Sequence, residues 1–196
     1  MEIYKTIILA IAAYFIGSIS PSYIITKKAT GKDIRSIDKK NAGALNVFLN
    51  VGTSQGIIVG IIDCLKTFLI VLAGQLWGLD PVHTIIAASF GIIGHCFPVY
   101  HHFYGGKGAA PVIGIFIYFI PLELLISVIP SALVAHAIGG LGISPVFFIA
   151  LSPLIAFIFN KPSSLVFALS YVAFLTGIIN LIVILTKRSQ KKLKLI

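Results

Sequence analysis

Residues 84–108, TIIAASFGIIGHCFPVYHHFYGGKG, join an apolar run to a glycine-rich turn that carries one lysine. The apolar part is typical of a membrane helix, and Lys107 stands among three glycines shortly after it. Glycine lets an anion approach backbone N–H groups closely, and a lysine adds positive charge. The spacing differs from the P-loop of nucleotide-binding proteins. The stretch therefore predicts a phosphate-binding loop at the surface of a bilayer.

The composition of the whole chain is that of a membrane protein. Of its 196 residues, 58% are hydrophobic and 11% are charged, and the mean hydropathy is +1.03. Soluble domains carry about 25% charged residues. So much apolar surface excludes a soluble domain of this size. The apolar segments recur without a long polar linker, which predicts a single transmembrane domain over residues 1–196.

Seven apolar segments are candidates for membrane helices, because a helix crosses a bilayer with roughly 20 residues, or fewer when it is tilted or shielded. The expected helices are residues 6–25, 53–72, 83–100, 109–120, 122–137, 143–159 and 163–185. The first lacks a small-x-small cleavage site, so we expect a retained helix and not a signal peptide. Pro121 and Pro130 interrupt the region 109–159, which by itself fits two or three crossings.

Basic residues crowd two segments, 27–40 and 187–194. Both should be cytoplasmic by the positive-inside rule, so an even number of crossings separates them. The sequence thus predicts an all-α integral membrane protein with seven transmembrane helices, its N-terminus outside and its C-terminus cytoplasmic. The net charge of +9 reflects this topology and favours anionic lipids and substrates. No basic–aromatic module lies outside the helices, so nucleic acid is not an expected partner.

Several polar residues can be structural or functional. Asp33 and Arg35 can pair within the first basic loop, and residues 41–43, Asn-Ala-Gly, suit a turn that opens a helix. Asp63 and Lys66 share one face of the second segment. Charges at membrane depth are costly, so this pair is either a functional site or a structural ion pair.

Other polar residues carry less signal. Glu123 is expected at the outer interface, and His136 marks the inner end of its helix. A metal site around Cys96 and the neighbouring histidines lacks a second cysteine at ligand spacing and a nearby carboxylate, so we expect no metal.

The chain resembles the bacterial membrane-integral glycerol-3-phosphate acyltransferases that use acyl phosphate as donor. The resemblance covers nearly the whole chain and depends on motifs in a fixed order. These are GSIS (17–20), DIR (33–35), NAGALNV (41–47), DCLK (63–66), GHCFPV (94–99) and GGKG (105–108). That family has seven helices and an outside N-terminus, which agrees with the charge argument.

The resemblance implies acyl transfer to the 1-hydroxyl of glycerol 3-phosphate, without a cofactor, in phospholipid synthesis at the bacterial inner (plasma) membrane. Acyl phosphate and glycerol 3-phosphate would be the substrates, and membrane lipid the surroundings. The implied catalytic residues are Lys107, His95 and Asn46, of which His95 and Asn46 shape the site. The implied substrate-binding residues are Arg35, Asn41, Gly105, Gly106, Gly108, Lys39 and Lys40.

Two alternatives stay open at this stage. Asp38-Lys39-Lys40 replaces the Gly-Ser-Gly typical of the family, which favours a catalytically weakened paralogue that binds acyl phosphate or lysophosphatidate as a regulator or partner subunit. A small transporter that uses Asp63 and Lys66 is the other, although no repeat with discontinuous helices is visible. Oligomeric state, acyl-chain preference and the true acceptor are left open by the sequence.

Overall fold

The computed structural model describes residues 2–37, 41–138 and 144–193, and these residues contain α-helices, 3₁₀ turns and loops but no strand. The described elements are α1 (Glu2–Ser18), α2 (Pro21–Thr30), η1 (Ile34–Ser36), α3 (Ala44–Asn50), α4 (Thr53–Leu76), α5 (Pro81–Cys96), η2 (Val99–His101), α6 (Ala109–Phe119), α7 (Pro121–Ile138), α8 (Ser144–Ile158) and α9 (Ser163–Leu193).

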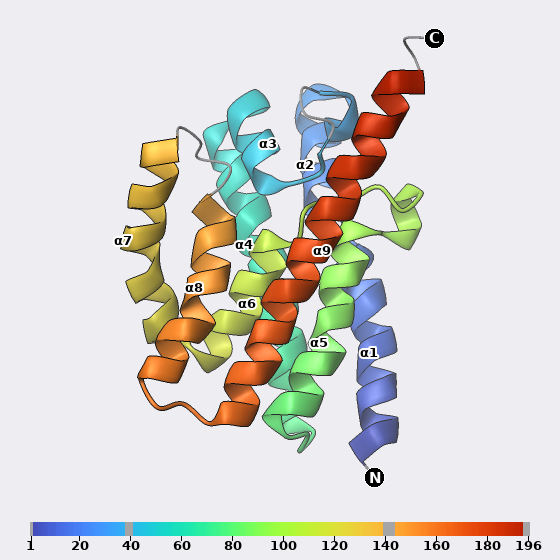
Figure 1. The fold of residues 1–196 in the computed structure, drawn as a ribbon. Coiled ribbons are helices and arrows are strands. Elements are labelled where there is room, and N and C mark those ends of the chain that lie inside the picture. Colours follow the sequence, from blue (N-terminus) through green and yellow to red (C-terminus); the bar gives the residue numbers. More distant parts are fainter. Residues whose placement is uncertain (1, 38–40, 139–143, 194–196) are drawn as a thin grey trace.

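The long helices run side by side, and the chain direction alternates from one to the next (Figure 1). The N-terminus of α1 lies at one end of the bundle. At the opposite end, which we call the inner end, lie α2, α3, the loop between α5 and α6, and the last turns of α9 (Figure 1). Polar loops that are far apart in sequence therefore meet at one end, as the charge pattern predicted.

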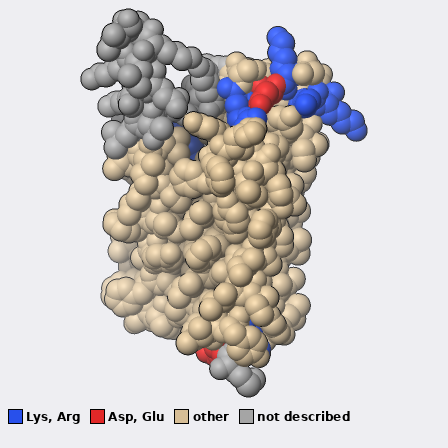
Figure 2. Space-filling model, turned by 90° about the vertical axis from the view of Figure 1, so that its right-hand side faces the viewer, with Lys and Arg blue, Asp and Glu red and all other residues tan. Residues whose placement is uncertain are grey.

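The helices confirm a multi-pass membrane protein. Among the described residues, four stretches are long and apolar enough to cross a bilayer: Glu2–Thr30, Thr53–Leu76, Pro81–His101 and Ser163–Val183. Shorter apolar helices are Ala109–Phe119, Pro121–Ala137 and Pro145–Ile158. On the face shown in Figure 2, Lys and Arg gather at the inner end, and the described middle of the face shows no charged side chain.

One detail of the predicted helices was wrong. The first segment is not one helix, because α1 ends at Ser18 and α2 begins at Pro21. Proline has no N–H for the carbonyl four residues earlier, so the helix breaks there. The predicted helix 122–137 is confirmed: Pro121 begins α7, and Pro130 lies inside it without ending it.

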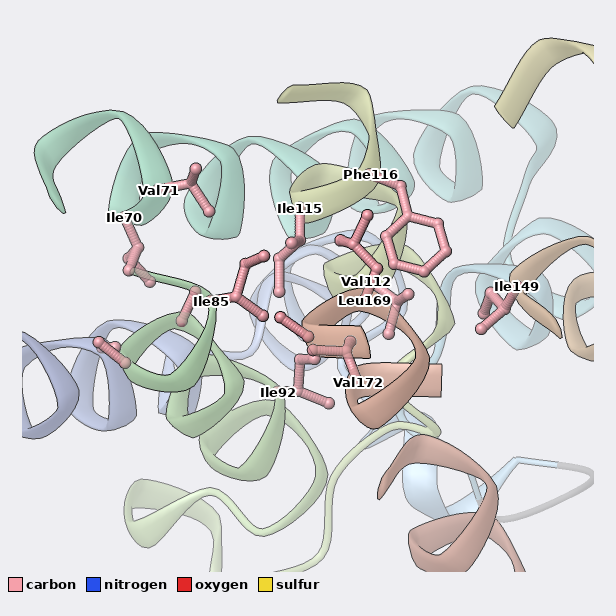
Figure 3. Close-up of a cluster of buried hydrophobic side chains, with 14 of the residues drawn as sticks. Ile70, Val71, Ile85, Ile92, Val112, Ile115, Phe116, Ile149, Leu169 and Val172 are labelled. Atoms are coloured by element: carbon pink, nitrogen blue, oxygen red, sulfur yellow. The ribbon is translucent and has the colours of Figure 1, made fainter. Parts of the chain in front are cut away.

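The core lies between α4, α5, α6 and α9. Ile85, Val112, Ile115, Phe116 and Leu169 are fully buried there, and Figure 3 shows them converging from these helices. Glycines bring α1 and α5 into backbone contact. A Cβ atom on Gly17 would lie 2.1 Å from the Gly91 carbonyl oxygen, and one on Gly94 would lie 2.2 Å from the Tyr14 carbonyl oxygen. Small residues permit such close packing of membrane helices.

Helices α7 and α8 form a hairpin that packs against α6 and α9 and buries polar groups. The hydroxyls of Ser127 and Ser152 lie 2.9 Å apart across it. Glu123, which was expected at the outer interface, lies in the first turn of α7. Within the protein it is 2% exposed, and its carboxylate lies 3.5 Å from the Lys161 ammonium. The chain that leaves α8 packs Lys161 over this carboxylate.

Candidate active site

The loop of residues 105–108, which we call the glycine–lysine loop, folds back onto the end of α5. Gly105 N–H donates to the Cys96 carbonyl (3.1 Å), and Gly106 N–H donates to the His95 carbonyl (3.1 Å). A Cβ atom on Gly105 would lie 2.0 Å from the His95 carbonyl oxygen, so only glycine fits. These two N–H groups face α5, whereas the Lys107 side chain is exposed. The loop thus presents its charge outward.

The first basic loop meets the glycine–lysine loop through a short chain of hydrogen bonds. Ser22 Oγ donates to the Ala42 carbonyl (2.9 Å), and Ala42 N–H donates to the Gly105 carbonyl (3.4 Å). We call the contact of residues 33–37 and 41–46 with residues 97–108 the inner junction. It brings the Asn41 turn beside the loop that carries Lys107.

Arg35 provides a second link across the inner junction. Its Nε lies 3.0 Å from each Asp33 carboxylate oxygen and its Nη2 lies 2.6 Å from one of them, which confirms the predicted pair. Its Nη1 donates to the His101 carbonyl (2.7 Å). Hydrogen bonds from Arg35 lower the pKa of the Asp33 carboxyl, and the same bonds raise the pKa of Arg35. The guanidinium therefore stays charged and fixed at the junction.

Asn46, on α3, holds the first basic loop by hydrogen bonds to its backbone. It is buried, and its Nδ2 lies 2.8 Å from the Asn41 carbonyl, 3.3 Å from the Ile37 carbonyl and 3.4 Å from the Ile34 carbonyl. The Asn41 Oδ1 is buried without a hydrogen-bond partner among the described residues. A buried acceptor of this kind calls for a donor. Helix α3 opens directly after residues 41–43, as predicted.

His95 belongs to a buried cluster with Asp63 and Lys66. The Lys66 ammonium lies 2.8 Å from Asp63 Oδ1, and His95 Nδ1 lies 3.2 Å from the same oxygen. The predicted Asp63–Lys66 pair is confirmed. A Cβ atom on Gly106 would lie 2.1 Å from His95 Nε2, so the imidazole forms a wall behind the glycine–lysine loop.

Sequence reasoning missed Asn180. This residue of α9 donates from Nδ2 to the Lys107 carbonyl (3.0 Å) and to the Thr176 carbonyl (2.9 Å). An amide within a predicted membrane helix was the available signal, because such side chains hydrogen-bond to neighbouring segments. Asn180 fixes the backbone at the residue whose side chain carries the charge.

The structure brings seven of the predicted site residues to the inner end, from η1, α3, α5 and the two loops: Arg35, Asn41, Asn46, His95, Gly105, Gly106 and Lys107. Gly108, at φ 85°, caps α6 beside them. Lys39 and Lys40 lie outside the described residues.

A possible metal-ligand group among the described residues lies far from this site. Ligand atoms of Glu2, Asp80 and His83 are within 4.8 Å of one another, near the N-terminal end of α1. Asp80 also caps α5 by accepting from the N–H groups of Val82 and His83, which accounts for its position. This group takes no part in the inner junction.

Comparison with known proteins gives one consistent family. The family model described as glycerol-3-phosphate acyltransferase matches residues 7–194. A glycerol-3-phosphate acyltransferase of Clostridioides difficile (strain 630) is 35% identical over 165 residues, covering 76% of this chain and 79% of the relative. One of Geobacter metallireducens is 39% identical over 120 residues, and the match spans 61% of each chain.

Solved structures give the same result for the fold. The crystal structure of PlsY (YgiH), an integral membrane glycerol 3-phosphate acyltransferase, in its glycerol 3-phosphate form has a TM-score of 0.77 at 26% identity. The match covers 90% of this chain and 86% of that one. The lysophosphatidic acid form has a TM-score of 0.74, with 94% and 93% covered.

Proposed function

This chain belongs to the glycerol-3-phosphate acyltransferase family, and we propose that it transfers an acyl group from acyl phosphate to the 1-hydroxyl of glycerol 3-phosphate. The products are 1-acylglycerol 3-phosphate (lysophosphatidate) and phosphate. The inner junction is the observation that carries this proposal. It joins two segments that are 63 residues apart, Ala42 and Gly105, and collects lysine, arginine and asparagine groups suited to two anionic substrates.

The reaction needs little from the protein beyond binding and positioning. The glycerol 1-hydroxyl oxygen forms a bond to the acyl carbonyl carbon as the bond from that carbon to the phosphate oxygen breaks. The hydroxyl proton leaves with the departing phosphate, so atoms and charges balance without a protein nucleophile. Acyl phosphate is already activated, and holding two reactants in line contributes several kcal/mol or more to catalysis.

The proposed roles follow from where each side chain lies. The Lys107 ammonium, exposed beside the junction, binds a phosphate, and Arg35 adds a second positive charge. The Asn41 Oδ1, which has no partner among the described residues, accepts from a substrate hydroxyl, which would satisfy its hydrogen-bonding capacity. His95 and Asn46 are buried and hold the two loops, so they shape the site and do not react with substrate.

We propose that α1 with α2, α4, α5, α6, α7, α8 and α9 make seven crossings of a bacterial plasma membrane, with the inner end in the cytoplasm. The alternating chain direction and the cationic inner end support this orientation (Figures 1 and 2). Reporter fusions at the two termini test it, since a periplasmic reporter should be active only at the N-terminus. An active periplasmic reporter at the C-terminus would contradict the proposal.

The function is tested by turnover of the purified chain in lipid vesicles. Acyl phosphate and glycerol 3-phosphate together should release phosphate and form lysophosphatidate, and omission of either should abolish product. Glycerol and dihydroxyacetone phosphate serve as alternative acceptors. If a folded sample shows ligand-dependent thermal stabilisation without turnover above empty vesicles, the chain is a binding protein and the proposed activity is wrong.

A further inference from the structure

The break in the first span exposes carbonyl groups inside the bundle. Pro21 has no N–H to donate to the Gly17 carbonyl four residues earlier. Two residues further on, Tyr23 N–H donates to Ser20 Oγ (3.4 Å) in the cap of α2. The carbonyls at the end of α1 therefore need donors from another part of the chain, because buried unpaired carbonyls are costly in a membrane.

Lys66 of α4 supplies those donors. Its ammonium donates to the Gly17 carbonyl (2.9 Å) and to the Ile19 carbonyl (2.8 Å), and it lies 2.8 Å from Asp63 Oδ1. An ammonium has three N–H donors, and these three oxygen acceptors lie closer to it than His95 Nδ1, which is 3.4 Å away. The residue is 8% exposed, and a cation at a helix C-terminus is also favoured by the helix dipole.

The same cluster supports both sides of the inner junction. On one side, α2 continues beyond the break and Ser22 of its first turn holds the Ala42 carbonyl (2.9 Å). On the other side, Asp63 Oδ1 lies 3.2 Å from His95 Nδ1, and the His95 ring stands behind Gly106. A change at the ammonium therefore alters the position of the Asn41 turn relative to the glycine–lysine loop.

We propose that Lys66 is a positioning residue, whose ammonium replaces the backbone hydrogen bond lost at Pro21 and so sets the distance between the two halves of the inner junction. The inference rests on the proposed acyl transfer. It differs from a simple buried ion pair, because it assigns the function to the contacts with the Gly17 and Ile19 carbonyls and not to neutralisation of Asp63.

A charge-neutral double variant distinguishes positioning through the carbonyl contacts from simple neutralisation of Asp63. Asp63→Asn with Lys66→Met removes both charges and also the carbonyl contacts. We expect it to fold, with kcat/KM at least tenfold below the wild type and with faster amide hydrogen exchange in residues 19–30. The control is Glu123→Gln with Lys161→Met, which removes the pair between a buried carboxylate and the part-exposed Lys161 in the α7–α8 region. It should leave kcat/KM and the hydrogen exchange of residues 19–30 unchanged.

Chemical rescue of the activity gives a result that general destabilisation of the fold would not produce. Lys66→Ala leaves room for a small primary amine, so propylammonium should restore part of the activity. Tetramethylammonium has the charge but no N–H donor, so it should not restore activity. If Lys66→Ala does not fold without a cation, recovery of its melting transition by propylammonium alone serves as the same test.

Three results would overturn the inference. They are wild-type kcat/KM in the Asp63→Asn, Lys66→Met double variant, unchanged exchange in residues 19–30, and equal rescue by the two ammonium ions. A wild-type chain that folds but lacks turnover would instead refute the proposed function. The hydrogen-exchange comparison would then still decide whether Lys66 positions the junction.

Discussion

The inner junction and the α7–α8 hairpin both bury polar side chains among apolar helices, but they use them differently. In the hairpin, Ser127 donates to the Leu124 carbonyl and Ser131 to the Ser127 carbonyl, three and four residues away, and the contact between the Ser127 and Ser152 hydroxyls crosses 25 residues. At and beside the inner junction, the bonds of Lys66 to Gly17 and of Asn180 to Lys107 cross 49 and 73 residues. Local bonds satisfy a helix, whereas long-range bonds hold separate segments in one geometry. A site that must fit two substrates needs the second kind.

Of the predicted effects, the loss of kcat/KM on replacement of Lys107 should be the largest. Loss of one charge-assisted contact to phosphate costs about 1.5–3 kcal/mol, so Lys107→Ala should lower kcat/KM roughly ten- to a hundredfold. The melting temperature should stay near that of the wild type, because the side chain is exposed. Lys107→Arg should recover only part of the activity. Lys32→Ala, an exposed cation at the same end, is the control, and an equal loss there would contradict a specific role for Lys107.

Glycine substitutions should distinguish a position packed against another side chain, Gly106, from a position with open space, Gly177. Gly106→Ala would place a Cβ atom 2.1 Å from His95 Nε2, and overpacking of this kind costs about 1–3 kcal/mol. Gly177→Ala on α9 meets no atom within 4 Å and should gain up to about 1 kcal/mol from helix propensity. Thermal unfolding and turnover of both variants measure the difference. Equal effects would mean that His95 does not constrain the loop.

A pair of serine substitutions compares the regions directly. Ser22→Ala removes the bond to the Ala42 carbonyl, and Ser127→Ala removes the contacts of the Ser127 hydroxyl with the Leu124 carbonyl and the Ser152 hydroxyl. Each should cost about 1 kcal/mol of stability. Only Ser22→Ala should also reduce turnover, by a few-fold, because it loosens the Asn41 turn. If Ser127→Ala reduced turnover as much, the hairpin would contribute to the site and the contrast between the regions would fail.

The smallest expected effect concerns pH. Because Arg35 lowers the pKa of Asp33 below its ordinary value of 3.8, the stability from this pair is fully present above that value. It is lost as the pH falls through the lowered pKa, so no change is expected near neutrality. A ¹³C NMR titration of the Asp33 carboxyl should give a midpoint below 3.8, and Arg35→Gln should raise it. A midpoint at or above 3.8 would exclude the pair in solution.

Much of the fold was predictable because hydropathy and basic residues report directly on membrane helices. All seven apolar segments contain helices, and the polar loops meet at one end. The break at Pro21 was not predicted, because the mean hydropathy of residues 6–25 hides the serines and the proline that interrupt the apolar residues there. The contact of Glu123 with Lys161 was not predicted either, because a sequence does not show that Lys161 will cover this carboxylate.

The candidate site was predictable where one segment carries its own signal. The Gly-Gly-Lys-Gly motif and the Asp33–Arg35 spacing are local patterns, and the structure gives each a local geometry. Two other contacts are not local patterns. Asn180 binds the Lys107 carbonyl and Lys66 binds the Gly17 and Ile19 carbonyls, and these partners lie far along the chain. Such contacts depend on how helices pack, which hydropathy and spacing leave undetermined.

The bond from Asn180 to the Lys107 carbonyl has a consequence for biogenesis. During synthesis the glycine–lysine loop leaves the ribosome 73 residues before the amide that holds it. The loop therefore lacks one of its supports until α9 has entered the bilayer beside α5. A nascent chain with its first helices already inserted is consequently still without a finished site, and acquires it only when the late helix completes the bundle.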